Sequence, residues 1–240
     1  MLRHILILTI CLFAALVRPA LAQPAGSPAP LTLPPNTMEE RVRACVYCHG
    51  EAGKGTDRPY FPRLAGKPAG YLFNQLTAFR DGRRQYAPMN YLLAYLPDEY
   101  LQAMARYYAE ARIPYAAPQP ATGAESVLRR GQQLVQQGDS GRQIPACTAC
   151  HGPNLSGREP GIPGLIGLRS DYISAQLGAW RYGTRTSIEP DCMQLVAARL
   201  TEQDVAAVAA WLSSMPIPSE TRPLARSTAA LPLNCGSQKP

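Results

Sequence analysis

Two short segments of the chain carry the residues with the most distinctive chemistry. Both read Cys-x-x-Cys-His and continue with glycine: Cys45, Cys48 and His49 in the first, and Cys147, Cys150 and His151 in the second. Two thiols at this spacing can reach the two vinyl groups along one edge of a porphyrin, and the adjacent histidine then faces the iron. The pattern is the attachment sequence of c-type heme, so we expect two covalently bound heme c groups.

A zinc site and a redox dithiol are the alternatives for each motif. Each motif alone supplies three ligands, whereas structural zinc takes four, and a thioredoxin-like pair belongs in a βαβ setting. The terminal histidine, present in both copies, favours heme over these two alternatives.

The number of histidines limits the second axial ligand of each iron. Once His4 leaves with the signal peptide predicted below, His49 and His151 are the only histidines of the chain. The far side of each iron must then take a methionine, another side chain, water or nothing, and a methionine raises the reduction potential. Met89 and Met193 are the candidates, because they occupy equivalent positions in the sequence repeat described below. We expect both positions to lie in loops between the two later helices of each copy.

The other methionines lack this equivalence. Met38 has no counterpart in the other copy, Met104 lies on the inward face of a predicted helix where packing explains it, and Met215 follows the last helix. The predicted iron ligands are therefore His49 with Met89, and His151 with Met193.

Two prolines are candidates to orient the ligand histidines. A metal-bound imidazole usually donates its other N–H group to an acceptor, and the backbone carbonyl of Pro62 or Pro163 would serve in each copy. A plain turn is an equally good interpretation of either proline taken alone.

The chain repeats itself at a shift of 101 to 104 residues. Besides the two motifs, unlike features coincide in the same order: Tyr71 with Tyr172, Gln75-Leu76 with Gln176-Leu177, Phe79-Arg80-Asp81-Gly82 with Trp180-Arg181-Tyr182-Gly183, Met89 with Met193, Leu96 with Leu200, and Tyr107 with Trp211. Only loop lengths differ, so two copies of one domain explain the pattern.

Apolar residues that recur every three or four residues predict a mainly helical chain. We expect helices around residues 72–79 and 173–180, a helix opened by Pro97-Asp98-Glu99 and its partner over 201–212. A helix over 125–137 precedes the second motif, whereas the first motif has only a shorter one over 38–46. No segment shows convincing strand alternation.

The ends of the chain and the region between the copies are predicted to be non-domain segments. Residues 1–22 have a basic start, a short apolar run and the small residues Ala20-Leu21-Ala22, typical of a secretory signal peptide; the run is too short for an uncleaved anchor across about 30 Å of hydrocarbon. The predicted domains span residues 23–112 and 124–215, with a Pro-rich linker at 113–123 and an irregular tail at 216–240.

The charge balance argues against a nucleic-acid partner. The formal net charge of +7 falls to +5 when Arg3 and Arg18 leave with the signal peptide, and four heme propionates would bring it near +1. Neither half is polycationic, so no basic patch is expected.

Two further cysteines remain after heme attachment. Cys192 and Cys235 can form a disulfide that ties the tail to the segment presenting Met193, or remain free thiols, and Cys192 could compete for the iron. The sequence does not choose between the two states.

Taken together, these motifs resemble the diheme cytochromes c of the c4 type. The resemblance covers residues 38–215 and rests on the paired motifs, the Pro-x-Leu-x-Gly segments, Tyr-x-x-x-Gln-Leu, the aromatic-Arg-x-Gly run and the two methionines. It implies an all-α fold of two tandem class I cytochrome c domains, which are related by an approximate twofold axis with the heme propionates facing each other across the interface. It also implies His/Met ligation at both irons and electron transfer in the periplasm. The curtailed first helix, three inserted residues before Met193, Cys192 and the tail depart from the pattern.

The resemblance also implies a function. It is that of a carrier, not an enzyme, passing single electrons from a quinol-oxidising complex or a dehydrogenase to a terminal oxidase or reductase, with loose association with the membrane surface. One alternative is the diheme subunit of an oxidoreductase such as a flavin-dependent sulfide dehydrogenase. An enzyme in its own right, such as a peroxidase or a thiosulfate dehydrogenase, would need an open or replaceable iron site.

Overall fold

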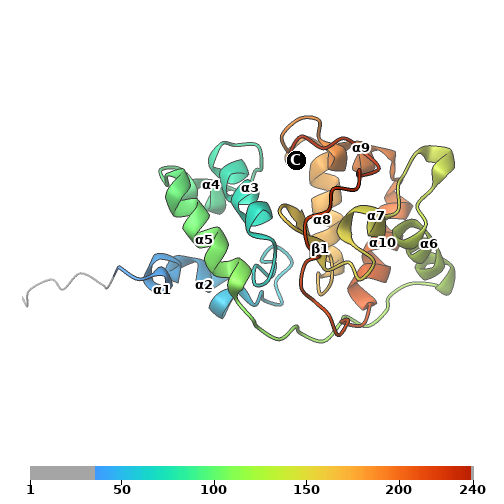
Figure 1. Ribbon diagram of the computed structural model, residues 1–240. Coiled ribbons are helices and arrows are strands. Elements are labelled where there is room, and N and C mark those ends of the chain that lie inside the picture. Colours follow the sequence, from blue (N-terminus) through green and yellow to red (C-terminus); the bar gives the residue numbers. More distant parts are fainter. Residues whose placement is uncertain (1–35, 239–240) are drawn as a thin grey trace, which may run out of the picture. The chain divides into compact units, whose positions relative to one another are not determined.

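The computed structural model describes residues 36–238, so the predicted signal peptide lies outside the described residues (Figure 1). The mainly helical prediction is confirmed. In the first half, residues 36–112, the elements are α1 Met38–Arg41, α2 Arg43–His49, η1 Glu51–Gly53, α3 Ala69–Arg80, α4 Ala87–Leu93 and α5 Asp98–Glu110. In the second half, residues 124–215, they are α6 Glu125–Gln136, η2 Ser140–Arg142, α7 Cys147–His151, β1 Gly157–Arg158, β2 Ile162–Pro163, α8 Ser170–Arg181, α9 Cys192–Arg199 and α10 Glu202–Ser214.

The core of the first half lies between α3 and α5. Four buried residues of α5 follow one another at helical spacing and therefore form one apolar face: Leu101, Met104, Ala105 and Tyr108. Met104 is 3% exposed within this core, which confirms the prediction that packing explains it.

The core of the second half is built on the crossing of α6 and α10, with α8 against α10. At Gly131, on α6, a Cβ atom would lie 2.2 Å from the backbone oxygen of Ala207, on α10. Only glycine allows this approach of the two helices. Leu134, Val135 and Leu212 fill the core around the crossing.

A buried carboxylate ties the same two helices together. Arg130 Nε, on α6, donates to Asp204 Oδ1 at 2.9 Å, and Arg142 Nη1, on η2, donates to Asp204 Oδ2 at 2.7 Å. Thr201 and Asp204 also form a capping box at the start of α10. Burial alone would raise the pKa of Asp204, but the hydrogen bonds from Arg142, Thr201 and Arg130 outweigh it and lower that pKa, so the carboxylate stabilises the second half at neutral pH.

The structure corrects several predicted elements. The predicted 38–46 helix is interrupted at Val42, where α1 ends, and α2 continues to His49. A two-residue antiparallel hairpin, β1 with β2, was not predicted, because such short strands have no alternation to detect.

The loop positions predicted for Met89 and Met193 are wrong. Met89 lies in α4, which begins with Pro in its first turn, and Met193 lies in α9, where the Asp191 side chain accepts hydrogen bonds from the backbone N–H groups of Met193 and Gln194. Both are ordinary helix-start signals that the sequence does contain.

The connection between the halves is held at both ends. The Arg63 guanidinium donates to the carbonyl groups of Ile113 and Pro114 and stacks over the Tyr115 ring at 4.0 Å. Further along, the backbone N–H of Gln119 donates to Ser213 O at 2.9 Å, and the Gln119 side chain accepts from Ser170 N at 2.9 Å.

The described part of the tail, residues 216–238, has no helix or strand of its own. It runs beside β1, where Leu224 N donates to Gly157 O at 2.9 Å and Leu224 O accepts from Glu159 N at 2.8 Å. In Figure 1 it then returns toward α9.

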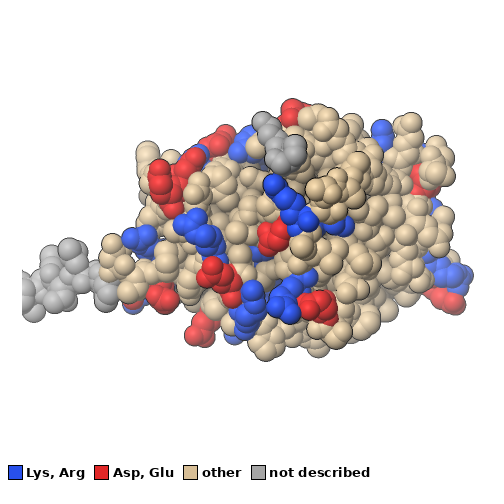
Figure 2. Space-filling model, viewed as in Figure 1, with Lys and Arg blue, Asp and Glu red and all other residues tan. Residues whose placement is uncertain are grey.

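Between residues 36 and 238, no helix is both long enough and apolar enough to cross a membrane. On the face drawn in Figure 2, basic and acidic side chains are interspersed, and much of the surface carries no charged side chain.

Candidate heme sites

The first site is built where α2 ends. His49, its last residue, is 8% exposed, and its Nδ1 lies 2.9 Å from the carbonyl oxygen of Pro62. Because a carbonyl only accepts, Nδ1 must donate, which leaves the lone pair of Nε2 free for a metal. Burial lowers the pKa of His49, so the imidazole is neutral as a ligand must be.

The second site repeats this arrangement. His151 ends α7, is 7% exposed, and holds its Nδ1 at 2.7 Å from the carbonyl oxygen of Pro163, while burial lowers its pKa as well. The predicted contacts of Pro62 and Pro163 are thus confirmed. The histidine and the proline are separated by 13 and 12 residues, so each acceptor lies in the segment that follows the motif, at Pro62 in a loop and at Pro163 in β2.

The four motif cysteines lie on the short helices α2 and α7, and none forms a disulfide. Burial raises the pKa of Cys45, and it raises the pKa of Cys147 to about 12. A reactive thiol needs a lowered pKa, so Cys45 and Cys147 do not have the character of redox-active thiols.

The two candidate methionines lie in the halves for which they were predicted, one on a cavity and one on a buried cluster. In the second half, Met193 and His151 line one cavity of about 190 Å³ together with Cys147 and Cys150. In the first half, Met89 and Cys45 pack against the same buried cluster, which includes Phe79 and Leu101. In the second half the structure therefore places Cys147, Cys150, His151 and Met193 around one cavity, whereas in the first half it places Met89 and Cys45 against one cluster.

The cavity of the second half, which we call the second cavity, fits a flat apolar group with a polar edge. Its walls include Ile173, Leu177 and Val208, and Trp180 Nε1 beside it is buried without a hydrogen-bond partner. A buried N–H group left unpaired is costly, so an acceptor on the bound group would satisfy it. A porphyrin with propionate groups has both the apolar body and the acceptor.

A pair of arginines, which the sequence did not single out, joins the two halves. Arg84 Nη2 donates to Tyr172 Oη at 3.1 Å and to Gln176 Oε1 at 2.6 Å, while its Nη1 donates to Gln75 Oε1 at 2.9 Å. Arg185 mirrors it: Nη1 donates to Gln176 Oε1 at 2.8 Å, and Nη2 donates to Gln75 Oε1 at 2.9 Å.

The stacking of these arginines follows the same symmetry. Arg84 lies over the Phe79 ring at 4.5 Å, and Arg185 lies over the Trp180 ring at 3.7 Å. The backbones also meet in an antiparallel bridge between Arg84 and Arg185. Each half therefore contributes one arginine to a shared cluster, which we call the arginine pair.

The arginine pair, in which Arg185 is buried and Arg84 is half-buried, carries positive charge without a carboxylate partner. Arg185 is 4% exposed, and among the described residues the ion pairs include neither Arg84 nor Arg185. Lys67 adds to the charge: its Nζ donates to Gly164 O at 2.9 Å, and burial lowers its pKa to about 8. The arginine pair and Lys67 together are suited to bind an anion, because buried charge without a counter-ion is strongly unfavourable.

The sequence did contain a signal for the arginine pair. Arg84 and Arg185 each stand two residues after the glycine of the aromatic-Arg-x-Gly run, at the same shift of 101 residues as Tyr71 and Tyr172. Extending the repeat alignment by two residues would have found them, although their meeting across the halves could not be read from spacing.

Comparison with known proteins identifies the family. The cytochrome c family model matches residues 128–216. The chain is 39% identical to a thiosulfate dehydrogenase electron acceptor from Thiomonas intermedia, over 72% of this chain and 79% of the relative. It is 32% identical to cytochrome c4 of Pseudomonas aeruginosa, over 74% and 86% of the two chains.

A solved structure agrees with the sequence relatives. Reduced recombinant cytochrome c4 from Pseudomonas stutzeri matches with a TM-score of 0.65 at 30% identity, covering 74% of this chain and 96% of that chain. With paired Cys-x-x-Cys-His motifs, matching helices and these relatives, the chain belongs to the c4-type cytochromes c, diheme electron-transfer proteins of class I cytochrome c fold that carry covalently bound heme c.

Proposed function

We propose that this chain is a periplasmic electron acceptor for a dehydrogenase and delivers single electrons to a terminal oxidase or reductase. The donor that we infer is a thiosulfate dehydrogenase, because the Thiomonas relative with that role shares 39% identity, against 32% for the Pseudomonas aeruginosa cytochrome c4. This difference is the observation that carries the choice of donor. Residues 1–22 would be the signal for export.

The proposed domains are residues 23–112 and 124–215, joined by the linker 113–123 and followed by the tail 216–240. Cys45 and Cys48 would hold one heme by thioether bonds, and Cys147 and Cys150 the other. His49 with Met89, and His151 with Met193, would be the axial ligands. When bound, each heme supplies a one-electron ferric/ferrous couple.

The protein's own contribution is orientation, exclusion of water and charge. The Pro62 and Pro163 carbonyls fix the imidazole rings at 2.9 and 2.7 Å. Apolar walls such as Ile173 and Leu177 keep water from the second site. The arginine pair would receive the heme propionates, which supply the negative charge that the polypeptide lacks there.

The donor assignment is tested by mixing the ferric protein with thiosulfate dehydrogenase and thiosulfate and following heme reduction optically. We expect both hemes to be reduced, and no reduction without thiosulfate. A flavin-dependent sulfide dehydrogenase with sulfide is the comparison donor. Thiosulfate dehydrogenase that turns over with an artificial acceptor but leaves this protein ferric would overturn the assignment.

Replacing either member of the arginine pair should lower a heme potential. Arg84→Gln removes a half-buried positive charge and Arg185→Gln a buried one. Each charge favours the reduced iron, so we expect a fall on the order of tens of millivolts, larger in the double variant. Potentiometric titration measures the shift. Arg181→Gln, at an exposed position of α8, is the matched control and should leave both potentials unchanged; equal potentials in all variants would remove the arginine pair from the propionate site.

A further inference from the structure

We propose that the disulfide-anchored tail is a cover for the second heme site, which keeps water and redox partners from it and makes the first site the point of electron exchange. The inference rests on the proposed heme ligation and goes beyond it, because the tail has no counterpart in the first half of the repeat.

The tail forms part of the cavity wall itself. Five of its residues line the second cavity together with Cys147, His151 and Met193: Leu231, Leu233, Cys235, Ser237 and Gln238. Two of them are leucines and Cys235 is 7% exposed, so the tail presents apolar side chains inward. A segment that only wrapped the outer surface would not contribute to the cavity.

The tail is fixed on the histidine side of the cavity. Leu224 bonds to the backbone of Gly157 and Glu159, and its side chain lies 3.0 Å from the position of a Cβ atom on Gly152, next to His151. Near the end of the described chain, the Gln238 side chain lies 2.7 Å from where a Cβ atom on Gly161 would stand. Both contacts are with the loop that follows the attachment motif.

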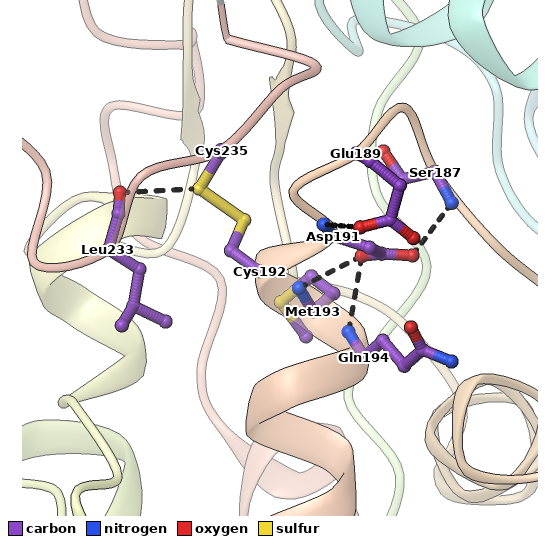
Figure 3. Close-up of a disulfide and its surroundings, with 8 residues drawn as sticks. All are labelled: Ser187, Glu189, Asp191, Cys192, Met193, Gln194, Leu233 and Cys235. Atoms are coloured by element: carbon purple, nitrogen blue, oxygen red, sulfur yellow. Dashed lines mark hydrogen bonds between the residues drawn. A yellow bond between two sulfur atoms is a disulfide. The ribbon is translucent and has the colours of Figure 1, made fainter.

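The tail is also fixed on the methionine side. Cys235 is bonded to Cys192, the residue immediately before Met193 at the start of α9 (Figure 3). Gly236 N donates to Pro190 O at 2.9 Å, and a Cβ atom at Gly236 would lie 1.9 Å from Glu189 O, so the chains are in close contact. The tail thus bridges the two walls from which the proposed axial ligands come.

The disulfide and the cap of α9 together restrain Met193. Asp191 is 3% exposed and holds the first turn of α9 through Met193 N and Gln194 N, both at 3.1 Å. In Figure 3 the Cys192 side chain leaves this turn toward Cys235, so the covalent link acts on the residue next to the proposed ligand. A bonded Cys192 also excludes its competition for the iron.

Within residues 36–238 no disulfide restrains the first site, and aromatic side chains near its motif and its candidate methionine are exposed. Pro88 stands where Cys192 stands in the second half. Tyr47, between the two attachment cysteines, is 83% exposed, and Tyr91 and Tyr95, in and after α4, are 83% and 95% exposed. Exposed aromatic side chains are typical of protein contact surfaces, so a redox partner has access to the first heme edge while the tail covers the second.

The test uses the full-length holoprotein with Cys192→Ser and Cys235→Ser together. We expect the reduction potential of the second heme to fall, because a more exposed iron is harder to reduce. We also expect this heme to bind added imidazole at least tenfold faster, because its iron is more accessible. The first heme should keep its potential and its rate of reduction by the donor. Leu195→Ser, at an exposed position of the same helix α9, is the matched control.

A chemical version avoids any folding defect of the variant. The wild-type disulfide is reduced and alkylated, the irons are reoxidised, and imidazole binding is followed on the intact and the opened protein. Equal imidazole-binding rates and equal reduction potentials in the intact and the opened protein would overturn the proposal that the tail covers the second site. The heme content and two-step titration of the untreated protein test the proposed function separately, so the two failures are distinguishable.

Discussion

Met193→Ala is expected to lower the potential of one of the two redox steps by on the order of a hundred millivolts or more, and Met89→Ala to lower the other. A thioether ligand favours ferrous iron, and its loss lets water or nothing occupy the position. Met193 lines the same cavity as His151, and Met89 packs in the same cluster as Cys45, so each change should be confined to its own half. Redox titration with optical spectra measures both steps.

The spectra distinguish ligand loss from a packing effect. In each variant, half of the weak sulfur-to-iron absorption of the ferric protein should disappear. Met104→Leu is the control, because Met104 is 3% exposed in the core of α5 and its replacement should change stability without moving either step. A Met193→Ala protein that keeps both potentials and the full sulfur band would remove Met193 from the ligand set.

The parts that could be predicted from the sequence are those with local or repeated causes. The attachment motifs are fixed by the chemistry of a porphyrin edge, and the helices by apolar residues at three and four positions, so both were correct in kind. The repeat singles out Met89 and Met193, whose role as iron ligands stays a prediction. Their predicted placement in loops was wrong, because Pro88 and Asp191 act as helix-start residues.

The parts that could not be predicted depend on contacts between distant segments. Arg84 and Tyr172 are 88 residues apart, and an arginine in a loop looks like surface charge until its partners are known. The Cys192–Cys235 disulfide was one of two open alternatives, because a separation of 43 residues does not determine geometry. The path of the tail along β1 depends on backbone bonds that leave no pattern in side chains.

Replacing Cys147 and Cys150 together by serine should give a protein with one heme and a strongly destabilised second half. Without the bound group, a cavity of about 190 Å³ stays empty, which at about 24 cal/mol per Å³ costs roughly 5 kcal/mol. That is comparable to the whole stability of a small domain. Intact mass measures the lost heme, and denaturant unfolding measures the loss of stability.

The loss should not be uniform across the second half, and amide hydrogen exchange can map it. Helices α8 and α9 contribute side chains such as Ile173, Trp180 and Met193 to the cavity, so their amides should lose protection first. The α6–α10 crossing is packed directly at Gly131 and tied by Asp204, so it should keep more. Cys45→Ser with Cys48→Ser is the reciprocal variant, and it should leave α8 and α9 protected while α3 and α4 weaken. Uniform protection in both variants would mean that each half folds on its polypeptide core alone, with the heme contributing nothing to it.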